Sequence, residues 1–416
     1  MTELEIVARV QSNAGHAVER LVCHPRLPLF ACLDSVRPAV GIWACDSGTL
    51  RQLGSMGTDS AVYSEALGWE RSQRTPAVAW HPHEAELMVA GEGTLTRWQP
   101  SGLTRLDSSI SAVHYNDLAF SPDGRTLWAS PSSGDDDAWE RSDVLDLGTG
   151  TVTVGPRWDT GITEHPGGSL VATLASDQGA TLGLFARASA DTTPAVMRLR
   201  SHALILDCDG YEAPIFSPDG RHLAIRGNAY GNSLDVFEFP SLCRVFSTSL
   251  GEPSPGYPYP EEWLRQMRAW SRHNIAFGTR HGVLWIGTPA GALVQVDIKA
   301  LAAQEHNVLA GAPVSALGRT ATDELVMASS TGELVLLAMG TVPVSVDDGE
   351  KTTPTPREAV ADFLDATTEL PDDADLDTDL VLTDGSTTWN SEDLAAINTA
   401  SVTDPTWLQI RAAMGE

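Results

Sequence analysis

Ten residues occur twice in the chain almost unchanged, as FSPDGRTLWA over residues 120–129 and as FSPDGRHLAI over residues 216–225. In each copy a Pro-Asp-Gly turn separates two short apolar runs. Proline presets φ for the first turn position, aspartate hydrogen-bonds to its own backbone, and glycine accepts the positive φ that closes the turn. The motif therefore predicts a β-hairpin, and its recurrence predicts a chain built from copies of one unit.

Weaker copies of this unit extend over most of the chain. The turn prolines are Pro25, Pro82, Pro122, Pro166 and Pro218, which are separated by 57, 40, 44 and 52 residues. Two degenerate copies begin at Ile275 and Val314. Seven units in about 340 residues match a β-propeller, whose four-stranded blades take roughly 40–50 residues each. We expect an all-β, seven-bladed β-propeller of four-stranded antiparallel blades, with six or eight blades as the alternatives.

The third strand of the first unit carries a family signature. Residues 40–50, VGIWACDSGTL, resemble the end of a WD repeat, with Ala44 at the position of the family's aspartate. Gly15 and His16 stand where that family has its Gly-His pair. The resemblance to WD-repeat β-propellers covers residues 1 to about 340. It implies the propeller fold and, by analogy of fold, a role in binding proteins or peptides.

The chain divides into three predicted parts. Residues 1–340 form the propeller, and residues 4–10 alternate like a strand that completes the last blade, which otherwise shows only three strands. Residues 341–356 form an acidic linker. Residues 357–416 form a small acidic α+β module with too little apolar content for an independent core. We expect this tail to dock against the side of the propeller or against a partner, and it is itself a candidate partner for the propeller's binding face.

Charge narrows the choice of partners. The formal net charge is −28, and residues 341–416 contribute −14 of it, from 17 acidic and three basic residues. Nucleic acid and anionic membranes bind basic surfaces through the release of counterions, so neither is expected as a partner. No apolar run approaches the roughly 20 residues that span a bilayer.

Composition also indicates a compartment and a source. The N-terminal segment has acidic residues where a signal peptide has basic ones, and the five cysteines lack C-x-x-C spacing. We therefore expect buried, reduced thiols and a cytoplasmic protein. Of the 27 basic residues all but Lys299 and Lys351 are arginine, which is typical of a GC-rich, bacterial genome.

Motifs for catalysis and for metal binding are missing from the sequence. Neither lysine follows a glycine, which excludes a P-loop, and no H-E-x-x-H pattern occurs. The acidic runs at residues 135–137 and 375–379 lack the glycine and the distal glutamate of a calcium loop. We expect no cofactor and no metal. An enzyme or small-molecule binder acting at the central channel stays open as the alternative, because residues from distant blades leave no local motif.

Four segments are longer than simple turns: residues 50–74, 131–142, 226–233 and 248–273. The alternation of strand direction in a blade places all four on one face of the propeller. In the longest, a helix is predicted over residues 261–271, with Trp263, Met267 and Trp270 on one stripe. This stripe either packs onto the rim of the propeller or forms a ridge that binds a partner.

A Trp-Glu-Arg triplet recurs on two of these segments, ending at Arg71 and at Arg141. It is either a remnant of repeat duplication or part of one binding surface. The candidate partner-binding residues are Tyr257, Tyr259, Trp263, Arg268, Trp270, Trp69, Arg71, Trp139 and Arg141. We expect a non-catalytic scaffold or adaptor that binds a protein or peptide on this face. An accessory factor of a defence or signalling system is a further interpretation.

Overall fold

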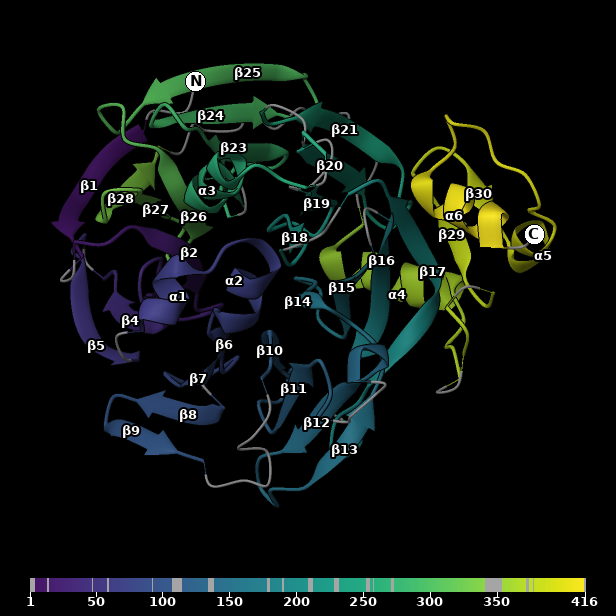
Figure 1. Cartoon of the computed structure of the whole chain (residues 1–416), viewed down its shortest axis with the longest axis horizontal. Coiled ribbons are helices and arrows are strands. Elements are labelled where there is room, and N and C mark those ends of the chain that lie inside the picture. The colour runs from purple at the N-terminus through teal and green to yellow at the C-terminus, as the bar shows by residue number, and fades with distance from the viewer. Residues whose placement is uncertain are drawn as a thin grey trace. The chain divides into compact units, whose positions relative to one another are not determined.

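The structure is a computed structural model (Figure 1). It describes residues 4–12, 15–46, 48–57, 60–91, 93–106, 114–133, 138–177, 180–188, 191–208, 212–227, 232–251, 255–256, 258–270, 273–340, 354–371, 374–376 and 378–414. The predicted acidic linker lies outside these residues up to position 353. The chain forms two compact units, Met1–Ala129 with Tyr259–Thr353, and Ser130–Pro258 with Pro354–Glu416.

The described strands form seven antiparallel four-stranded sheets, one of which is extended to six strands. This is the fold of a seven-bladed β-propeller, so the predicted all-β class and blade number are confirmed, and six and eight blades are excluded. Each sheet is built from consecutive strands, except that the first strand of the chain belongs to the last sheet and two strands near the C-terminus extend the six-stranded one. None of the described helices is long and apolar enough to cross a membrane.

The strands have the following bounds, sheet by sheet. The first three sheets contain β2 (Val18–Cys23), β3 (Leu29–Asp34), β4 (Ala39–Ala44) and β5 (Arg51–Gly57); β6 (Ala77–Trp80), β7 (Leu87–Gly91), β8 (Thr94–Gln99) and β9 (Gly102–Arg105); and β10 (Asp117–Phe120), β11 (Thr126–Ser130), β12 (Ser142–Asp146) and β13 (Val152–Gly155). The fourth and fifth contain β14 (Thr160–Glu164), β15 (Leu170–Asp177), β16 (Ala180–Ala188) and β17 (Met197–Leu206); and β18 (Ile215–Phe216), β19 (His222–Arg226), β20 (Ser233–Glu238) and β21 (Arg244–Ser249). The last two contain β22 (Ile275–Phe277), β23 (Val283–Gly287), β24 (Ala292–Asp297) and β25 (Ala302–Asn307); and β26 (Val314–Arg319), β27 (Leu325–Ser329), β28 (Glu333–Met339) and β1 (Leu4–Gln11).

The remaining elements are short. They are α1 (Ala61–Glu65), α2 (Gly68–Arg74), the 3-10 helix η1 (Ala138–Glu140), α3 (Glu261–Trp270), α4 (Pro356–Ala366), β29 (Val381–Thr383), β30 (Thr388–Trp389), α5 (Ser391–Ala395) and α6 (Thr406–Met414).

The Ser-Pro-Asp-Gly turns have the same hydrogen bonds in both close copies. Between β10 and β11, Ser121 Oγ donates to Asp123 Oδ1 at 2.6 Å and accepts the N–H of Thr126 at 3.0 Å. Gly124 has φ +73°, which favours glycine. The turn between β18 and β19 repeats these contacts from Ser217. The serine of the motif therefore closes the hairpin together with the Pro-Asp-Gly residues.

A histidine before the turn proline links neighbouring sheets. Two backbone N–H groups of its own turn donate to Nδ1 of His24, at 3.0 and 3.1 Å. Nε2 therefore carries the proton and donates to the carbonyl of Glu84 in the next sheet, at 2.8 Å. His165 makes the equivalent bond to the carbonyl of Gly220, at 2.9 Å. Both histidines are almost fully buried, and burial lowers the pKa of each ring.

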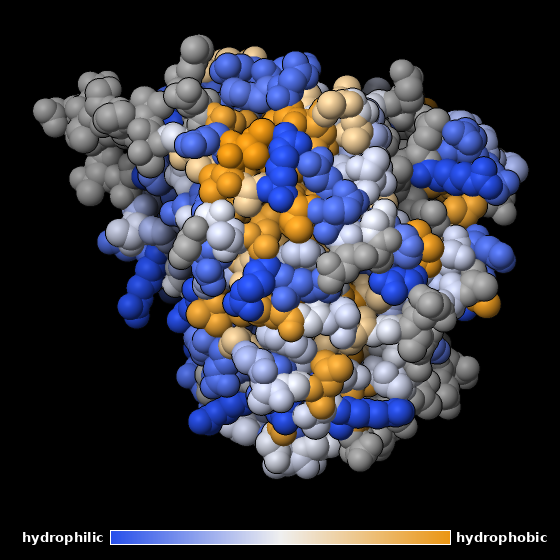
Figure 2. Space-filling view, turned by 90° about the vertical axis from the view of Figure 1, so that its left-hand side faces the viewer, coloured by the Kyte–Doolittle hydropathy of each residue, from blue (hydrophilic) through white to orange (hydrophobic). Residues whose placement is uncertain are grey.

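The N-terminal strand, β1, is the outermost strand of the seventh sheet, and Figure 2 shows the side of the molecule that carries it. It pairs antiparallel with β28 along most of its length. Arg9 adds to this pairing, because its guanidinium contacts the Glu333 carboxylate at 3.0 Å and the carbonyl of Val308 at 2.8 Å. The first and last strands of residues 1–340 are thus joined in one sheet.

The C-terminal residues extend the fourth sheet (Figure 1). β29 pairs in parallel with β17, and β30 pairs antiparallel with β29. The tip of this hairpin reaches the fifth sheet, where the N–H of Arg244 donates to the carbonyl of Gly385 at 3.0 Å. Gly385 has φ +87°, and a side chain there would lie within 3 Å of Arg244 and Phe237. Glycine is therefore required at this contact.

The helix α4 is held at both ends. Thr355 and Glu358 form a capping box at its N-terminus. At the other end Arg200 of β17 donates from Nε to Thr367 Oγ1 at 3.0 Å and from Nη2 to the carbonyl of Leu364 at 2.8 Å. A cation at the C-terminus of a helix also interacts favourably with the helix dipole.

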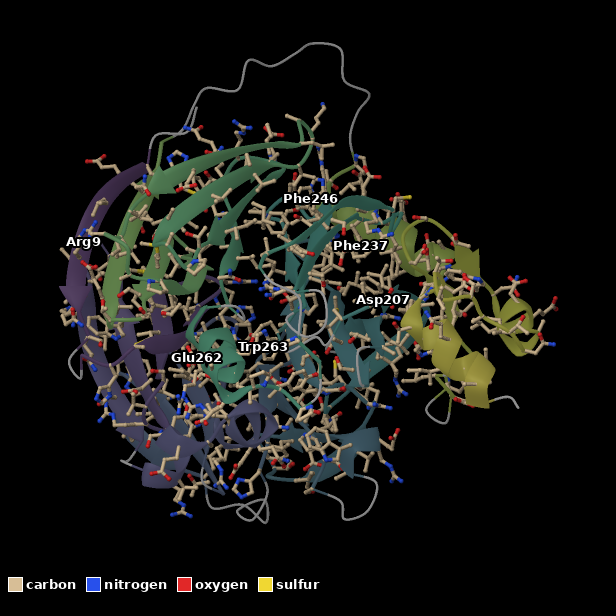
Figure 3. The ribbon with its side chains drawn as sticks, turned by 45° about the horizontal axis from the view of Figure 1, so that its top comes forward. Arg9, Asp207, Phe237, Phe246, Glu262 and Trp263 are labelled. Atoms are coloured by element: carbon tan, nitrogen blue, oxygen red, sulfur yellow. The ribbon has the colours of Figure 1, made fainter. Side chains whose placement is uncertain are left out.

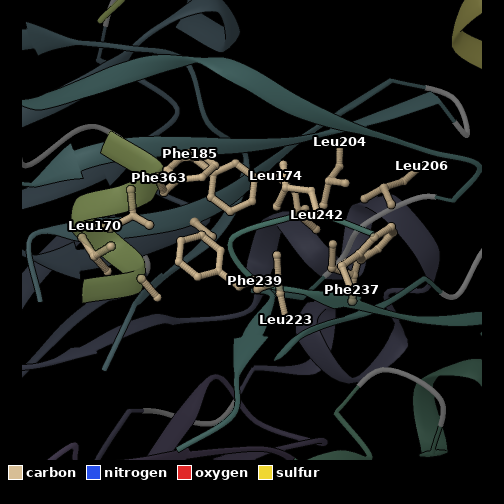
Figure 4. Packing of buried hydrophobic residues seen from close by; sticks show 14 of the residues in the cluster. Leu170, Leu174, Phe185, Leu204, Leu206, Leu223, Phe237, Phe239, Leu242 and Phe363 are labelled. Atoms are coloured by element: carbon tan, nitrogen blue, oxygen red, sulfur yellow. The ribbon is translucent and has the colours of Figure 1, made fainter. Parts of the chain in front are cut away.

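Apolar packing secures the same module. Phe363 of α4 lies against Phe185 and Phe239, with ring centroids 5.0 and 5.2 Å apart (Figure 4). Leu382 and Trp407 belong to a second cluster with side chains of β16 and β17. The C-terminal residues thus share their core with the fourth and fifth sheets, which explains how a segment with so little apolar content is ordered.

Two details differ from the sequence-based expectations. Residues 51–57 form β5, so the first long insertion begins after Gly57 instead of at residue 50. Cys243 is exposed in the turn between β20 and β21, whereas the other four cysteines are buried or half-buried. The expectation of buried thiols is therefore wrong for Cys243.

Candidate functional site

Two short helices, α1 and α2, follow β5 and precede the second sheet. The hydroxyl of Ser60 caps α1 by accepting the N–H of Tyr63 at 3.3 Å. The hydroxyl of Thr75 donates to the carbonyl of Arg71 at 3.0 Å at the end of α2. Local capping therefore explains where α1 begins and where α2 ends.

Arg71 connects these helices to the first sheet. Its guanidinium forms an ion pair with Glu19 of β2 and donates to the carbonyls of Tyr63 and Ser35, at 2.9 and 3.0 Å. The same group lies 3.2 Å from the centroid of the Tyr63 ring. Arg71 is 1% exposed and Glu19 is 3% exposed. Because a buried charge is stable only with its partner, this network fixes α1 and α2 in position.

The helix α3 comes from the later insertion and contacts β2 and β26. The ring of Tyr259 stacks on Trp263 of α3, with centroids 5.0 Å apart and planes 23° apart. Trp263 is half-buried, and Figure 3 labels it next to Glu262 on the helix. After the helix, the N–H of Leu317 in β26 donates to the carbonyl of His273 at 2.7 Å. The helix is thus held on the inner strands of two sheets.

Both insertions are therefore fixed on one strand, β2, although they are about 190 residues apart in sequence. We call residues 60–74 and 258–270 the helical platform. It carries the exposed apolar side chain of Val62, which is 55% exposed, and two exposed ion pairs. These pairs join Arg74 to Glu70 at 2.9 Å and Arg265 to Glu261 at 2.5 Å. Apolar and aromatic groups bordered by charged ones are typical of protein-binding surfaces.

The platform contains several of the predicted partner-binding residues. Tyr259 and Trp263 lie on it. Tyr257 lies outside the described residues, and for Trp69, Arg268 and Trp270 the structure describes the backbone in α2 and α3 but not the side chain. Arg71 is buried against Glu19 and is not accessible to a partner, so we withdraw it from the candidate residues.

The second Trp-Glu-Arg triplet belongs to the other unit and has a different environment. Trp139 lies in η1 and is 39% exposed, and Arg141 directly after it is also exposed. The N–H of Ser132 donates to the carbonyls of Ala138 and Arg141, at 3.0 Å each, and this closes the loop. The two triplets therefore share a sequence but not a structural role, since the first buries its arginine and the second exposes it.

Sequence reasoning missed Glu19, Tyr63 and Val62. Glu19 lies in a strand 52 positions before Arg71, and no local pattern links the two. The capping serine before α1 is the one local signal that marks this helix.

In the residues that the structure describes, no three His, Cys, Asp or Glu side chains gather in an arrangement that could hold a metal ion. The buried histidines His24 and His165 are engaged in turn hydrogen bonds. Burial raises the pKa of the Cys45 thiol to about 12, so this side chain stays protonated at neutral pH.

Comparisons with known proteins do not assign this chain to a family. No protein-family model matches this chain, and no curated protein is significantly similar to it.

Proposed function

We propose that the protein is a non-catalytic scaffold or adaptor and that the helical platform binds a protein or peptide. The observation that supports this is the convergence of two distant insertions on β2, one of them through a fully buried ion pair. A rigid platform lowers the entropy that is lost when a partner binds.

The resemblance of residues 40–50 and of the Gly15-His16 pair to WD repeats supports the same proposal. We propose a divergent member of the WD-repeat propellers. In this structure His16 Nδ1 lies 3.0 Å from Asp34 Oδ2, which ties the segment before β2 to the end of β3. The arginine-rich composition and the absence of C-x-x-C spacing support a bacterial, cytoplasmic protein.

The charge of the molecule restricts the proposed partner. A net charge of −28 favours a partner with a neutral or basic binding surface and disfavours nucleic acid. The alternative of a small-molecule binder is favoured by one observation, a cavity of about 290 Å³ lined mostly by residues of the first sheet.

Affinity capture with matched variants tests the proposal. The double variant Val62→Asp and Trp263→Ala changes the platform, and Leu103→Asp changes a side chain of β9 that is 53% exposed in the same unit. We expect a stoichiometric partner to bind the wild type and L103D with equal affinity. Its affinity for the platform variant should fall by more than about 30-fold, the effect of losing a binding hot spot.

The proposal fails if a correctly folded platform variant retains the partner with unchanged affinity. It also fails if the wild type captures no stoichiometric protein. Thermal unfolding of each variant, measured before capture, separates loss of binding from loss of fold.

A further inference from the structure

The outer strand of the fourth sheet, β17, changes its partners along its length. Its pairing with β16 is interrupted at residues 200–202, which together face one residue of β16. These three residues pair with the C-terminal residues instead. The N–H of Ser201 donates to the carbonyl of Thr368 at 2.9 Å, and His202 lies opposite Val381 of β29. We call residues 199–204, 367–370 and 381–383 the seam.

A buried guanidinium lies in the seam. Arg200 is 8% exposed, and it donates from Nε to Thr367 Oγ1 at 3.0 Å and from Nη2 to the carbonyl of Leu364 at 2.8 Å. The carboxylate of Glu369 is 3.9 Å from Nη1, which is too far for a hydrogen bond, and 43% of this side chain is exposed. The charge of Arg200 is therefore stabilised by carbonyl and hydroxyl oxygens of the C-terminal module, residues 354–416, and only weakly by a carboxylate.

His202 lies on the same face of β17 as Arg200, because alternate residues of a strand share a face. Its ring is half-buried, and Nδ1 is 3.4 Å from Ser201 Oγ. The same Oγ accepts the N–H of Thr368 at 3.1 Å. Leu204, the next residue on this face, packs in the cluster that contains the buried side chains of α4. The ring of His202 thus borders both the buried guanidinium and the C-terminal module.

The elements packed against this part of β17 carry few charges that act on the ring. Residues 381–383 of β29 contain no titratable side chain. Glu369 is shared between Arg198 and Arg200, at 3.9 Å from each. The remaining charged groups are Arg187 of β16, which opposes the charge of Arg200, the exposed carboxylates Asp362 and Asp365 of α4, the exposed Asp379 before β29, and Arg411 of α6.

The arginine of α6 belongs to the other face of the sheet. Arg411 lies against the ring of Trp407, and Trp407 packs in the cluster that contains Ala203. Ala203 points away from the face that carries Arg200 and His202, since neighbouring residues of a strand point to opposite faces. Arg200 is therefore the charged group that acts on the ring of His202 most directly.

We propose that His202 makes the docking of the C-terminal module sensitive to acid. Protonation of its ring places a second positive charge beside the buried guanidinium of Arg200, and two like charges repel most strongly where water is excluded. The module then loosens from β17, so that both charges reach water. Acid thus uncovers the outer edge of the fourth sheet, which the C-terminal residues cover at neutral pH.

Proton linkage gives the direction of the effect. Burial lowers the pKa of His202 in the docked state, and the like charge of Arg200 lowers it further. When the module leaves, the ring returns to water and to its ordinary pKa of about 6.5. Docking is therefore strongest above about pH 6.5 and weakens as the pH falls below this value. One histidine changes the docking equilibrium by at most about 10-fold between about pH 7.5 and about pH 5.5.

A buried carboxylate near the tip of the β29–β30 hairpin acts in the opposite sense. Asp235 lies 3.9 Å from Arg244, whose N–H donates to Gly385. Burial raises the pKa of Asp235, and the neighbouring Asp207 adds to this effect. Protonation of Asp235 therefore stabilises the folded protein and does not cause the proposed loss.

Amide hydrogen exchange of the whole chain at about pH 7.5 and about pH 5.5 tests the proposal. Each rate is divided into the intrinsic rate at the same pH, which gives a protection factor. The amides of Ser201 and Leu370 report on the seam, because each donates across it to a backbone carbonyl. We expect their protection factors to fall about 3- to 10-fold at the lower pH. The amides of β24, which lies between two strands of the sixth sheet, should change less.

Three variants assign the effect to His202. His202→Gln cannot take up a proton and should show the same protection of the seam at both pH values. His202→Lys carries a permanent charge, so its protection at about pH 7.5 should already equal that of the wild type at about pH 5.5. The control is His222→Gln, which removes another half-buried histidine, from β19, and should keep the fall seen in the wild type.

The wild type and His202→Gln decide the outcome without the lysine variant. The proposal is overturned if the protection of the seam in the wild type is equal at the two pH values. It is also overturned if H202Q loses as much protection as the wild type, or if the amides of the seam and of β24 lose protection equally.

Discussion

At the scale of single residues, the pair of Arg71 and Glu19 shows how a buried charge depends on its partner. Both side chains are almost fully buried, and one comes from α2 and the other from β2. Replacing Arg71 with Met leaves the Glu19 carboxylate buried without compensation. We expect the free energy of unfolding to fall by roughly 3–5 kcal/mol, measured by urea denaturation.

Two further variants separate charge from volume in this prediction. The double variant Arg71→Met and Glu19→Gln removes both charges and should recover part of the loss. Arg74→Met breaks the exposed pair with Glu70 on the same helix and should change stability by less than about 0.5 kcal/mol. Equal effects of R71M and R74M would show that the buried pair does not hold the platform.

At the scale of the turn that joins two strands, His24 and His165 predict that the free energy of unfolding depends on pH. Nδ1 of His24 and of His165 accepts backbone N–H groups, so protonation of the ring breaks these bonds. Burial places the pKa of both rings below the ordinary value in the folded state. The folded state thus binds fewer protons than the unfolded chain. The stability that these two histidines contribute is fully present above the unfolded pKa of about 6.5 and is lost as the pH falls below it.

Thermal unfolding between about pH 7.5 and about pH 5 measures this effect. We expect the melting temperature of the wild type to fall with pH in this range. The double variant His24→Gln and His165→Gln should be less stable at about pH 7.5 but should show a flatter pH dependence. Parallel curves for the two proteins would mean that other groups cause the acid sensitivity.

At the scale of the whole molecule, both ends of the chain serve as added strands, β1 on β28 and β29 on β17. Removing residues 1–12 exposes the edge of β28. We expect a loss of at least about 3 kcal/mol, or roughly 6–12 °C in melting temperature for a unit of this size. The control is Ile6→Thr on the same strand, where the side chain is 44% exposed and the expected change is below about 0.5 kcal/mol.

A second deletion tests how the C-terminal module contributes to the fold. Removing residues 354–416 uncovers Phe185 and Phe239, so we expect the shortened protein to aggregate on mild heating. A protease site inserted between residues 341 and 353 is the control. After cleavage the module should stay bound through α4 and β29 and elute with the remainder in size-exclusion chromatography. Release of the module, with an unchanged melting temperature of the remainder, would contradict this expectation.

Several elements could be read from the sequence because their chemistry is local. The repeated Ser-Pro-Asp-Gly turn predicted the hairpins, and the stripe of Trp263, Met267 and Trp270 predicted α3. Each signal acts between residues a few positions apart. The boundary of the first insertion was wrong, because residues 51–57, which were assigned to it, form β5.

The sequence by itself determined the repeated blades and their hairpins and indicated seven of them, since period and turn chemistry are properties of neighbouring residues. Only the tertiary structure decided that Arg71 is buried while Arg141 is exposed, although the same triplet contains both. It also decided that Glu19 and Arg71, 52 positions apart in sequence, form one buried ion pair. The physical reason is that burial and hydrogen-bond partners depend on contacts between distant segments, which leave no local period in the sequence.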